Sequence, residues 1–139
     1  MILFDTSVII DAIEKDSPWH SWAREQIANA VAAEGAGINP LVLAEACVRA
    51  FTPEEVLGKL QGFGCELVSL PPACAIPTAK AYAIYLKRRK ESGQGEGPRT
   101  PLPDFFIGAH AAVEGLALLT RDADRVRTYF PNVALITPE

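Results

Sequence analysis

The chain has 139 residues, 49% hydrophobic and 22% charged, which suits one globular domain over residues 1–139 with a substantial core. A formal net charge of −4 argues against a protein that coats nucleic acid broadly, although it is compatible with a local basic groove. Three cysteines without metal-ligand spacing (Cys47, Cys65 and Cys74) indicate a reducing compartment, and no stretch is long and apolar enough to span a membrane. We therefore expect a cytoplasmic protein.

Short apolar segments alternate with helical patterns along the first half of the chain. Asp5, Thr6 and Ser7 are all good helix-capping residues, so a helix is expected directly after the first apolar segment. In chain order, the expected elements are a strand over 1–4, helices over 7–14 and 17–34, a short strand within 35–39, helices over 40–51 and 52–64, and a strand over 65–70.

The second half continues the alternation. The expected elements are a helix over 71–93 whose regular part starts near Pro77, a glycine- and proline-rich loop over 93–103, a helix over 104–115, a strand over 116–120, a turn and short helix over 121–131, and a strand over 133–137. Alternating short strands and helices predict a mostly parallel sheet with helices on both faces. Sites in such sheets form beyond the carboxyl ends of the strands, near a topological switch point.

Four acidic residues fall where such a site is expected. Asp5 ends the first strand, and Asp122 follows the strand over 116–120 after one intervening residue. Asp104 lies in the first turn of its predicted helix, and Glu45 lies within the apolar helix over 40–51. If the two strands are neighbours, these carboxylates converge at one edge of the sheet.

Each acid also has a purely structural interpretation. Asp5 and Asp122 are suited to capping helices, and Asp104 is favourable at the positive end of a helix dipole. Glu45 is spaced to pair with Arg49 one turn later. Asp124 is an alternative to Asp122 as the fourth acid. Asp11 and Glu14 are expected at the surface of the first helix.

Convergence of the four acids favours a cation site. Two carboxylates about 4 Å apart repel by roughly 4 kcal/mol at an effective dielectric constant of 20, so a cluster needs a counter-charge. Oxygen ligands are those that Mg²⁺ and Mn²⁺ prefer. Carboxylate-bound metals at the edge of an α/β sheet suit phosphoryl chemistry.

Four segments together resemble one known family. They are "LFDTSVIID" at the start, "LVLAEA" with Glu45, "LPDFFIGAHA" with Asp104, and "LLTRDADRVRTYFP" with Asp122. In this order they are similar to PIN-domain proteins, specifically VapC-type toxin ribonucleases. The resemblance implies a three-layer α/β/α sandwich around a parallel sheet and a Mg²⁺- or Mn²⁺-dependent endoribonuclease.

The resemblance also implies roles for individual residues. Catalysis would fall to Asp5, Glu45, Asp104 and Asp122, with Asp5, Asp104 and Asp122 holding the metal. Thr6 and Ser7 would assist by hydrogen-bonding the acids or metal-bound water. Thr120 is a weaker candidate for the same role. The family further implies an RNA substrate and a cognate antitoxin, and Trp19 and Trp22 are candidates for an antitoxin or homodimer interface. Alternatives are a phosphatase with Asp5 as nucleophile, which usually carries a second acid where this chain has Ser7, and a non-catalytic binding module.

The remaining polar motifs favour a supporting role. His110 is expected to be structural because its position turns it away from the acidic face. The run from Lys87 to Lys90 predicts either a solvated helix end or a phosphate-binding edge. The residues expected to contact RNA phosphates are Arg88, Arg89, Arg99 and Arg121, with Lys87 and Lys90 beside them.

Overall fold

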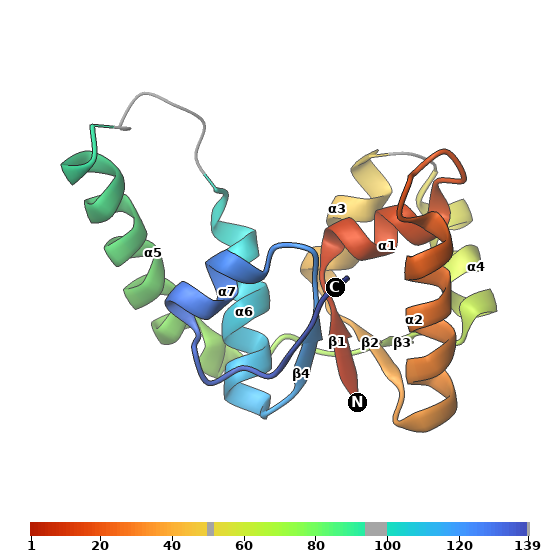
Figure 1. The fold of residues 1–139 in the computed structure, drawn as a ribbon. Helices are drawn as coiled ribbons and strands as arrows, with labels where there is room; N and C mark the ends of the chain where they lie inside the picture. Colours follow the sequence, from red (N-terminus) through yellow and green to blue (C-terminus); the bar gives the residue numbers. More distant parts are fainter. Residues whose placement is uncertain (50–51, 94–99, 139) are drawn as a thin grey trace.

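Five short parallel strands form one sheet (Figure 1). The computed structural model describes residues 1–49, 52–93 and 100–138. The strands are β1 (Ile2–Phe4), β2 (Ala36–Ile38), β3 (Glu66–Leu67), β4 (Ala117–Leu119) and β5 (Leu135–Ile136), in the spatial order β3-β2-β1-β4-β5. Every neighbouring pair is parallel, as the alternation of strands and helices predicted.

Helices cover both faces of this sheet. They are α1 (Thr6–Ile13), α2 (His20–Ala33), α3 (Pro40–Arg49), α4 (Pro53–Phe63), the short 3₁₀ helix η1 (Pro72–Cys74), α5 (Ala75–Glu91), α6 (Leu102–Glu114) and α7 (Ala123–Tyr129). Figure 1 shows α1, α2 and α4 on one side of the sheet and α5, α6 and α7 on the other. The expected three-layer α/β/α sandwich is therefore confirmed.

The switch point lies between β1 and β4. From β1 the chain moves to β2 on one side, whereas β4 continues to β5 on the other. Phe4 pairs with Leu119 at the carboxyl ends of the two strands, and the backbone N–H of Asp5 donates to the carbonyl of Leu119 at 3.0 Å. The residues that follow, Asp5 and Thr120, consequently lie side by side although 115 positions separate them.

Local signals account for most element boundaries. Asp5 has extended backbone angles and caps α1, which starts one residue earlier than predicted. Thr52 caps α4 by accepting from the N–H of Glu55, and Gly64 ends that helix in the left-handed conformation. Helix α5 begins at Ala75 rather than near Pro77, because the first turn of a helix tolerates a proline. Strand β3 is shorter than the predicted 65–70.

A dense core fixes the central strands beneath the site. Leu3, Phe4, Leu118 and Leu119 are essentially inaccessible to solvent. Helix α6 packs closely at Gly108, where an added Cβ atom would lie 2.5 Å from the ring of Phe130. All three cysteines are free, and among the described residues no helix is long and apolar enough to cross a membrane. The edge that carries Asp5 and Thr120 thus rests on rigid, buried strands.

Candidate active site

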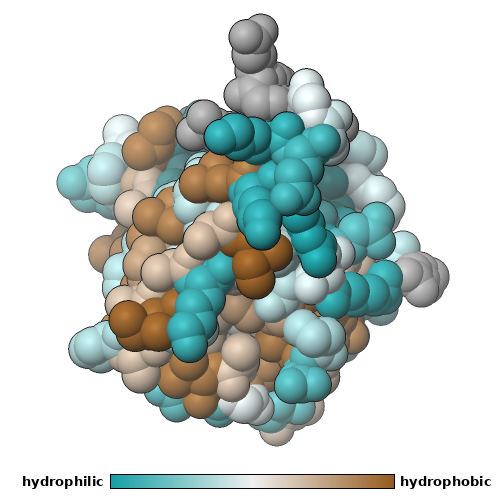
Figure 2. All heavy atoms as spheres, turned by 90° about the vertical axis from the view of Figure 1, so that its left-hand side faces the viewer, coloured by the Kyte–Doolittle hydropathy of each residue, from teal (hydrophilic) through white to brown (hydrophobic). Residues whose placement is uncertain are grey.

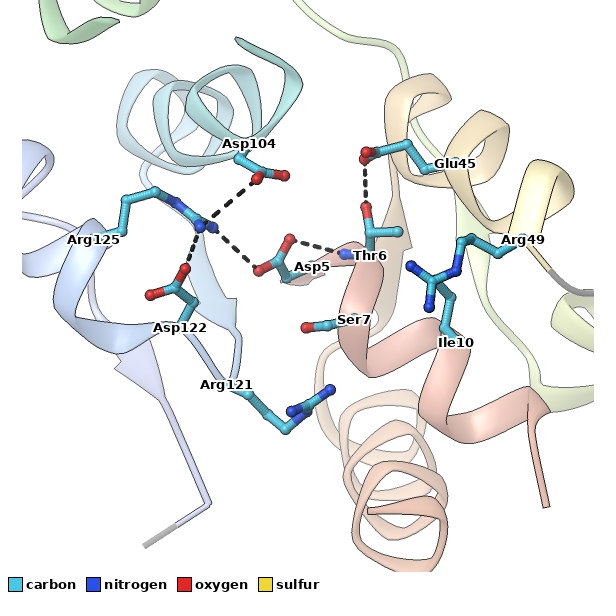
Figure 3. Close-up of a pocket in the computed structure, with 10 residues that line it drawn as sticks. All are labelled: Asp5, Thr6, Ser7, Ile10, Glu45, Arg49, Asp104, Arg121, Asp122 and Arg125. Atoms are coloured by element: carbon cyan, nitrogen blue, oxygen red, sulfur yellow. Dashed lines mark hydrogen bonds and ion pairs between the residues drawn. The ribbon is translucent and has the colours of Figure 1, made fainter. Parts of the chain in front are cut away.

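A cavity of about 350 Å³ opens beyond the carboxyl ends of β1 and β4 (Figure 3). All four predicted acids line it, although they come from four different parts of the chain. The lining residues are Asp5, Thr6, Ser7, Ile10, Glu45, Arg49, Asp104, Arg121, Asp122 and Arg125. Asp124 is exposed on α7 and does not line this cavity, which favours Asp122 as the fourth acid.

Asp5 is buried and engaged through both carboxylate oxygens. Its Oδ1 accepts from the backbone N–H of Thr6 at 2.8 Å, which confirms the predicted cap. Its Oδ2 accepts from the hydroxyl of Thr120 at 2.7 Å. Thr120 itself is fully buried and accepts from the N–H of Asp122 at 2.9 Å. One threonine therefore fixes both the carboxylate of Asp5 and the backbone at Asp122.

Glu45 reaches the cavity from α3. Its Oε1 accepts from the hydroxyl of Thr6 at 2.7 Å, so this bond joins α1 to α3. The alternative partner, Arg49, lies at the edge of the cavity, and the hydroxyl of Ser7 points into it (Figure 3). Thr6 thus orients Glu45 through its side chain and Asp5 through its backbone.

Asp104 lies in the first turn of α6, as predicted. Burial raises the pKa of its carboxyl to about 6; Arg125 opposes this rise, and the nearby carboxylates of Asp5, Glu45 and Asp122 add to it. Because its ordinary value is 3.8, this carboxyl is held in its charged form less firmly than an exposed aspartate. The cavity therefore concentrates negative charge.

The central residue that sequence reasoning missed is Arg125. Its guanidinium forms ion pairs with Asp5 at 3.6 Å, with Asp104 at 3.7 Å and with Asp122, one turn earlier on α7. In Figure 3 it lies among these three carboxylates. The only sequence signal was its i,i+3 spacing from Asp122, which is typical of ordinary surface pairs.

Arg121 is held at the rim by an acid that was predicted to be exposed. Asp11 is buried, so the expectation that it lies at the surface of the first helix was wrong. Its carboxylate accepts from Nε of Arg121 at 2.7 Å and from the hydroxyl of Ser17 at 2.8 Å. The guanidinium of Arg121 also lies 5.6 Å from the ring centre of Trp19. These contacts tie the α1–α2 loop to the loop after β4.

The basic run at the end of α5 lies apart from the cavity lining. Arg89 is buried and lies beside Tyr85, whereas the exposed Arg88 places its guanidinium 5.5 Å from the ring centre of Tyr129. Lys87 and Lys90 are exposed, and Arg99 falls outside the residues that the structure describes. Their binding of RNA stays a prediction, with Arg89 the least accessible of the described cations.

His110 has the predicted structural role, whereas an interface at Trp19 and Trp22 stays a prediction. His110 is buried, and its Nδ1 lies 3.2 Å from Nδ2 of Asn39, so it has the structural role that was predicted. Trp19 and Trp22 form an edge-to-face pair with ring centres 6.0 Å apart, and both are only partly exposed. Neither ranks among the most exposed large apolar residues of the described chain.

The donor set suits a hard divalent cation. Carboxylate and hydroxyl oxygens face one cavity, and three carboxylates already meet a single positive group. In the part of the chain that the structure describes, however, no three acidic, histidine or cysteine side chains stand ready to hold a metal ion. Asp5, Asp104 and Asp122 pair with Arg125, whereas Glu45 bonds to Thr6.

A comparison with known protein families matches residues 2–131 to the PIN domain. The chain belongs to the PIN domain family. The match includes all four acids, Thr120 and Arg125, so the cavity lies wholly within the family's domain. No curated protein sequence matches the chain significantly.

Solved structures confirm the PIN fold over almost the whole chain. VapBC2 from Rickettsia felis, bound to a DNA fragment from its promoter, matches with a TM-score of 0.69 and 20% identity, covering 99% of this chain and 98% of that one. DNA-bound VapBC from Salmonella typhimurium matches with a TM-score of 0.64 and 22% identity, covering 98% of this chain and 96% of that one. FitAcB from Neisseria gonorrhoeae matches with a TM-score of 0.63 and 21% identity, covering 99% of this chain and 98% of that one.

Proposed function

We propose that this PIN-domain chain is a Mg²⁺- or Mn²⁺-dependent endoribonuclease and the toxin component of a toxin–antitoxin pair. The observation that carries the proposal is the convergence of Asp5, Glu45, Asp104 and Asp122 on one cavity at the switch point of the sheet. In this proposal the four acids are catalytic, and Asp5, Asp104 and Asp122 hold the divalent cation.

The reaction proposed is hydrolysis of an RNA phosphodiester. When bound, a divalent cation lowers the pKa of water and offsets negative charge on the phosphate. Thr120 and Thr6 keep Asp5 and Glu45 in fixed orientations through their hydroxyl bonds. Positive charge at the rim comes from Arg121 and Arg49. It offsets the repulsion between the acidic cavity and the phosphates of the RNA.

The proposal of an antitoxin partner rests on the solved structures. The Rickettsia and Salmonella matches are VapBC assemblies, and this chain covers nearly all of the matched chain in each. Co-expression with the adjacent short reading frame should give a complex that co-purifies. Separate purification of the two proteins, followed by a titration without binding, would contradict this part of the proposal.

We also propose a homodimer, for which α5 offers an apolar surface. Ile76 and Ile84 expose 63% and 48% of their areas on this helix. Figure 2 shows hydrophobic residues interspersed with hydrophilic ones on this side of the molecule. Sedimentation of the wild type against an Ile76→Ser, Ile84→Ser variant should show a shift from dimer to monomer, whereas equal masses would exclude this surface.

The decisive experiment is an RNA cleavage assay. Purified protein is incubated with a panel of structured RNAs in Mg²⁺, in Mn²⁺ or in EDTA, and the cut ends are mapped. We expect cleavage at defined positions with either metal and none in EDTA. Intact RNA throughout would favour a binding module, and trapping of a phosphoaspartyl adduct on Asp5 would favour the phosphatase alternative.

A further inference from the structure

Arg125 occupies the centre of the acidic cluster. Its side chain is only 14% exposed, and it pairs with three of the four carboxylates that line the cavity. A planar guanidinium carries five donors in a fixed fork, so one arginine is able to face several carboxylates at once. Arg125 is the cation that the ion pairs of these three acids share.

This arginine supplies the counter-charge that the cluster requires. Carboxylates brought together in a partly buried cavity repel one another, by roughly 4 kcal/mol for a pair about 4 Å apart at an effective dielectric constant of 20. Arg125 offsets that repulsion from within the chain. In the part of the chain that the structure describes, the acids line one cavity without forming a group of three that stands ready to hold a metal ion.

We propose that Arg125 is a built-in counter-ion that competes with the divalent cation for this cavity. The inference rests on the function proposed above. A cation held by Asp5, Asp104 and Asp122 would share the very carboxylates that Arg125 now pairs with, and both oxygens of Asp5 already accept hydrogen bonds from Thr6 and Thr120. Metal binding therefore includes the opening of the Arg125 ion pairs, which lowers metal affinity and stabilises the metal-free protein.

Displacement of Arg125 is sterically simple. Its stem has several rotatable bonds, so the guanidinium is able to leave the acids without a change of fold. The cavity beside it is lined by Asp5, Asp104 and Glu45, whose side chains face one another across it (Figure 3). Arg125 thus acts through electrostatics on the acids and need not touch the reacting atoms.

Metal affinity of the intact protein, measured without RNA, tests the proposal. Mn²⁺ is titrated by calorimetry into wild type, Arg125→Gln and Arg125→Lys, and the melting temperature is recorded in EDTA. Arg127→Gln is the matched control, because it removes the same charge from the same helix at an exposed position that does not line the cavity.

We expect Arg125→Gln to bind Mn²⁺ at least about tenfold more tightly than wild type and to melt at a lower temperature in EDTA. Arg125→Lys should lie between them, because an ammonium faces fewer carboxylates at once, and it serves as the test if the Gln variant does not fold. Arg127→Gln should stay within about twofold of wild type.

Equal or weaker Mn²⁺ binding by the Arg125 variants would overturn the proposal. No binding by any of the proteins would overturn it together with the proposed metal dependence, which the RNA assay on wild type tests separately. A wild type that cleaves RNA, combined with unchanged Mn²⁺ affinity in the variants, would refute the role of Arg125 alone.

Discussion

Asp5 combines two roles that a single substitution separates. Its Oδ1 caps α1, whereas its Oδ2 faces Thr120 and Arg125. Asparagine keeps an acceptor for the cap but removes the charge. For Asp5→Asn, the capping role therefore predicts an intact fold, whereas the proposed metal role predicts a loss of RNA cleavage.

Asp5→Asn should reduce RNA cleavage at saturating Mg²⁺ by at least about 10²-fold, which corresponds to roughly 2.7 kcal/mol of transition-state stabilisation. The fold should survive because the cap remains. Initial cleavage rates and circular dichroism spectra check both statements. Asp124→Asn, an exposed acid outside the cavity, serves as the control and should cleave normally. Wild-type turnover by Asp5→Asn would refute the assignment.

The raised pKa of Asp104 predicts a pH-dependent stability. Its pKa is about 6 in the folded protein and near 3.8 when unfolded, so the native state binds more protons between these values. This carboxyl therefore lowers the free energy of unfolding as pH rises from about 4 to 6, and its effect is constant above that range. At neutral pH, in its charged form, it destabilises the metal-free protein.

Asp104→Asn should consequently be more stable than wild type in EDTA above pH 6, and this difference should shrink as pH falls toward 4. Urea unfolding across that range measures it. Asp124→Asn should leave the pH profile unchanged. Parallel profiles for wild type and Asp104→Asn would show that the pKa of Asp104 is not raised.

The sequence located the candidate acids of the site but not the arginines that pair with them and with Asp11. Asp5, Asp104 and Asp122 were identified because each lies at the end of a predicted strand or the start of a predicted helix. Arg125 and Asp11 were missed because their roles depend on contacts across the fold. Arg121, which follows β4, pairs with Asp11 on α1. The hydrophobic periodicity of neither segment predicts this long-range contact.

At the scale of elements, the α1–α2 loop is held by a small polar network. Asp11 on α1 accepts from Ser17 in the loop and from Arg121 after β4. The carbonyl of Asp11 also lies 2.9 Å from Nδ1 of His20, at the start of α2. The orientation of Arg121 at the rim of the cavity thus depends on α1.

Asp11→Asn should lower the free energy of unfolding by about 1 kcal/mol, because the buried Asp11 side chain loses its charge-assisted bond to Arg121, while the exposure of Arg121 limits the loss. It should also raise KM for RNA more than it lowers kcat, since Arg121 would no longer be held at the rim. Urea unfolding and steady-state cleavage measure these effects. Asp16→Asn, an exposed acid in the same loop, is the control.

A double-mutant cycle isolates this contact. If Asp11 acts through Arg121, the loss of stability in the Asp11→Asn, Arg121→Gln double variant should be smaller than the sum of the single losses. Fully additive losses would mean that the two residues stabilise the protein independently.

Element boundaries followed the sequence wherever a local signal existed. Thr52-Pro53 and Gly64 mark the two ends of α4 as predicted. Strand β3 was predicted too long because the apolar residues of 65–70 suggested continuous pairing, whereas β3 lies at the edge of the sheet and its contact with β2 ends where the N–H of Val68 donates to the carbonyl of Ile38. How far an edge strand extends is set by its neighbour β2, which spans three residues.

At the scale of the whole molecule, a protein with a net charge of −4 has to attract RNA, the substrate proposed above, through local positive charge. Lys87, Arg88 and Lys90 are exposed cations at the end of α5, whereas Arg89 is buried; Lys87 and Arg88 are the pair to test. Each phosphate contact to single-stranded RNA contributes about −0.7 to the slope of log K against log salt. If both side chains contact phosphates, their removal should flatten that slope by about 1.4.

The measurement uses Lys87→Gln, Arg88→Gln in a cleavage-deficient Asp5→Asn background, with RNA affinity recorded across a salt series. Binding should weaken similarly for all sequences, because phosphate contacts position the chain without specifying bases. Lys15→Gln, in the α1–α2 loop, is the control for a general loss of charge. An unchanged slope would mean that the basic run is a solvated helix end.

The strand order has a consequence for the order of synthesis. The site joins Asp5, near the start of the chain, to Thr120, Asp122 and Arg125 near its end, through the pairing of β1 with β4. A nascent chain that has not yet reached residue 117 carries Asp5 and Glu45 but has no partner for β1 on that side. If the chain is the nuclease proposed above, a ribosome that has not yet added residues 117–125 carries a polypeptide whose cavity is not assembled, so cleavage of nearby RNA has to wait for that segment.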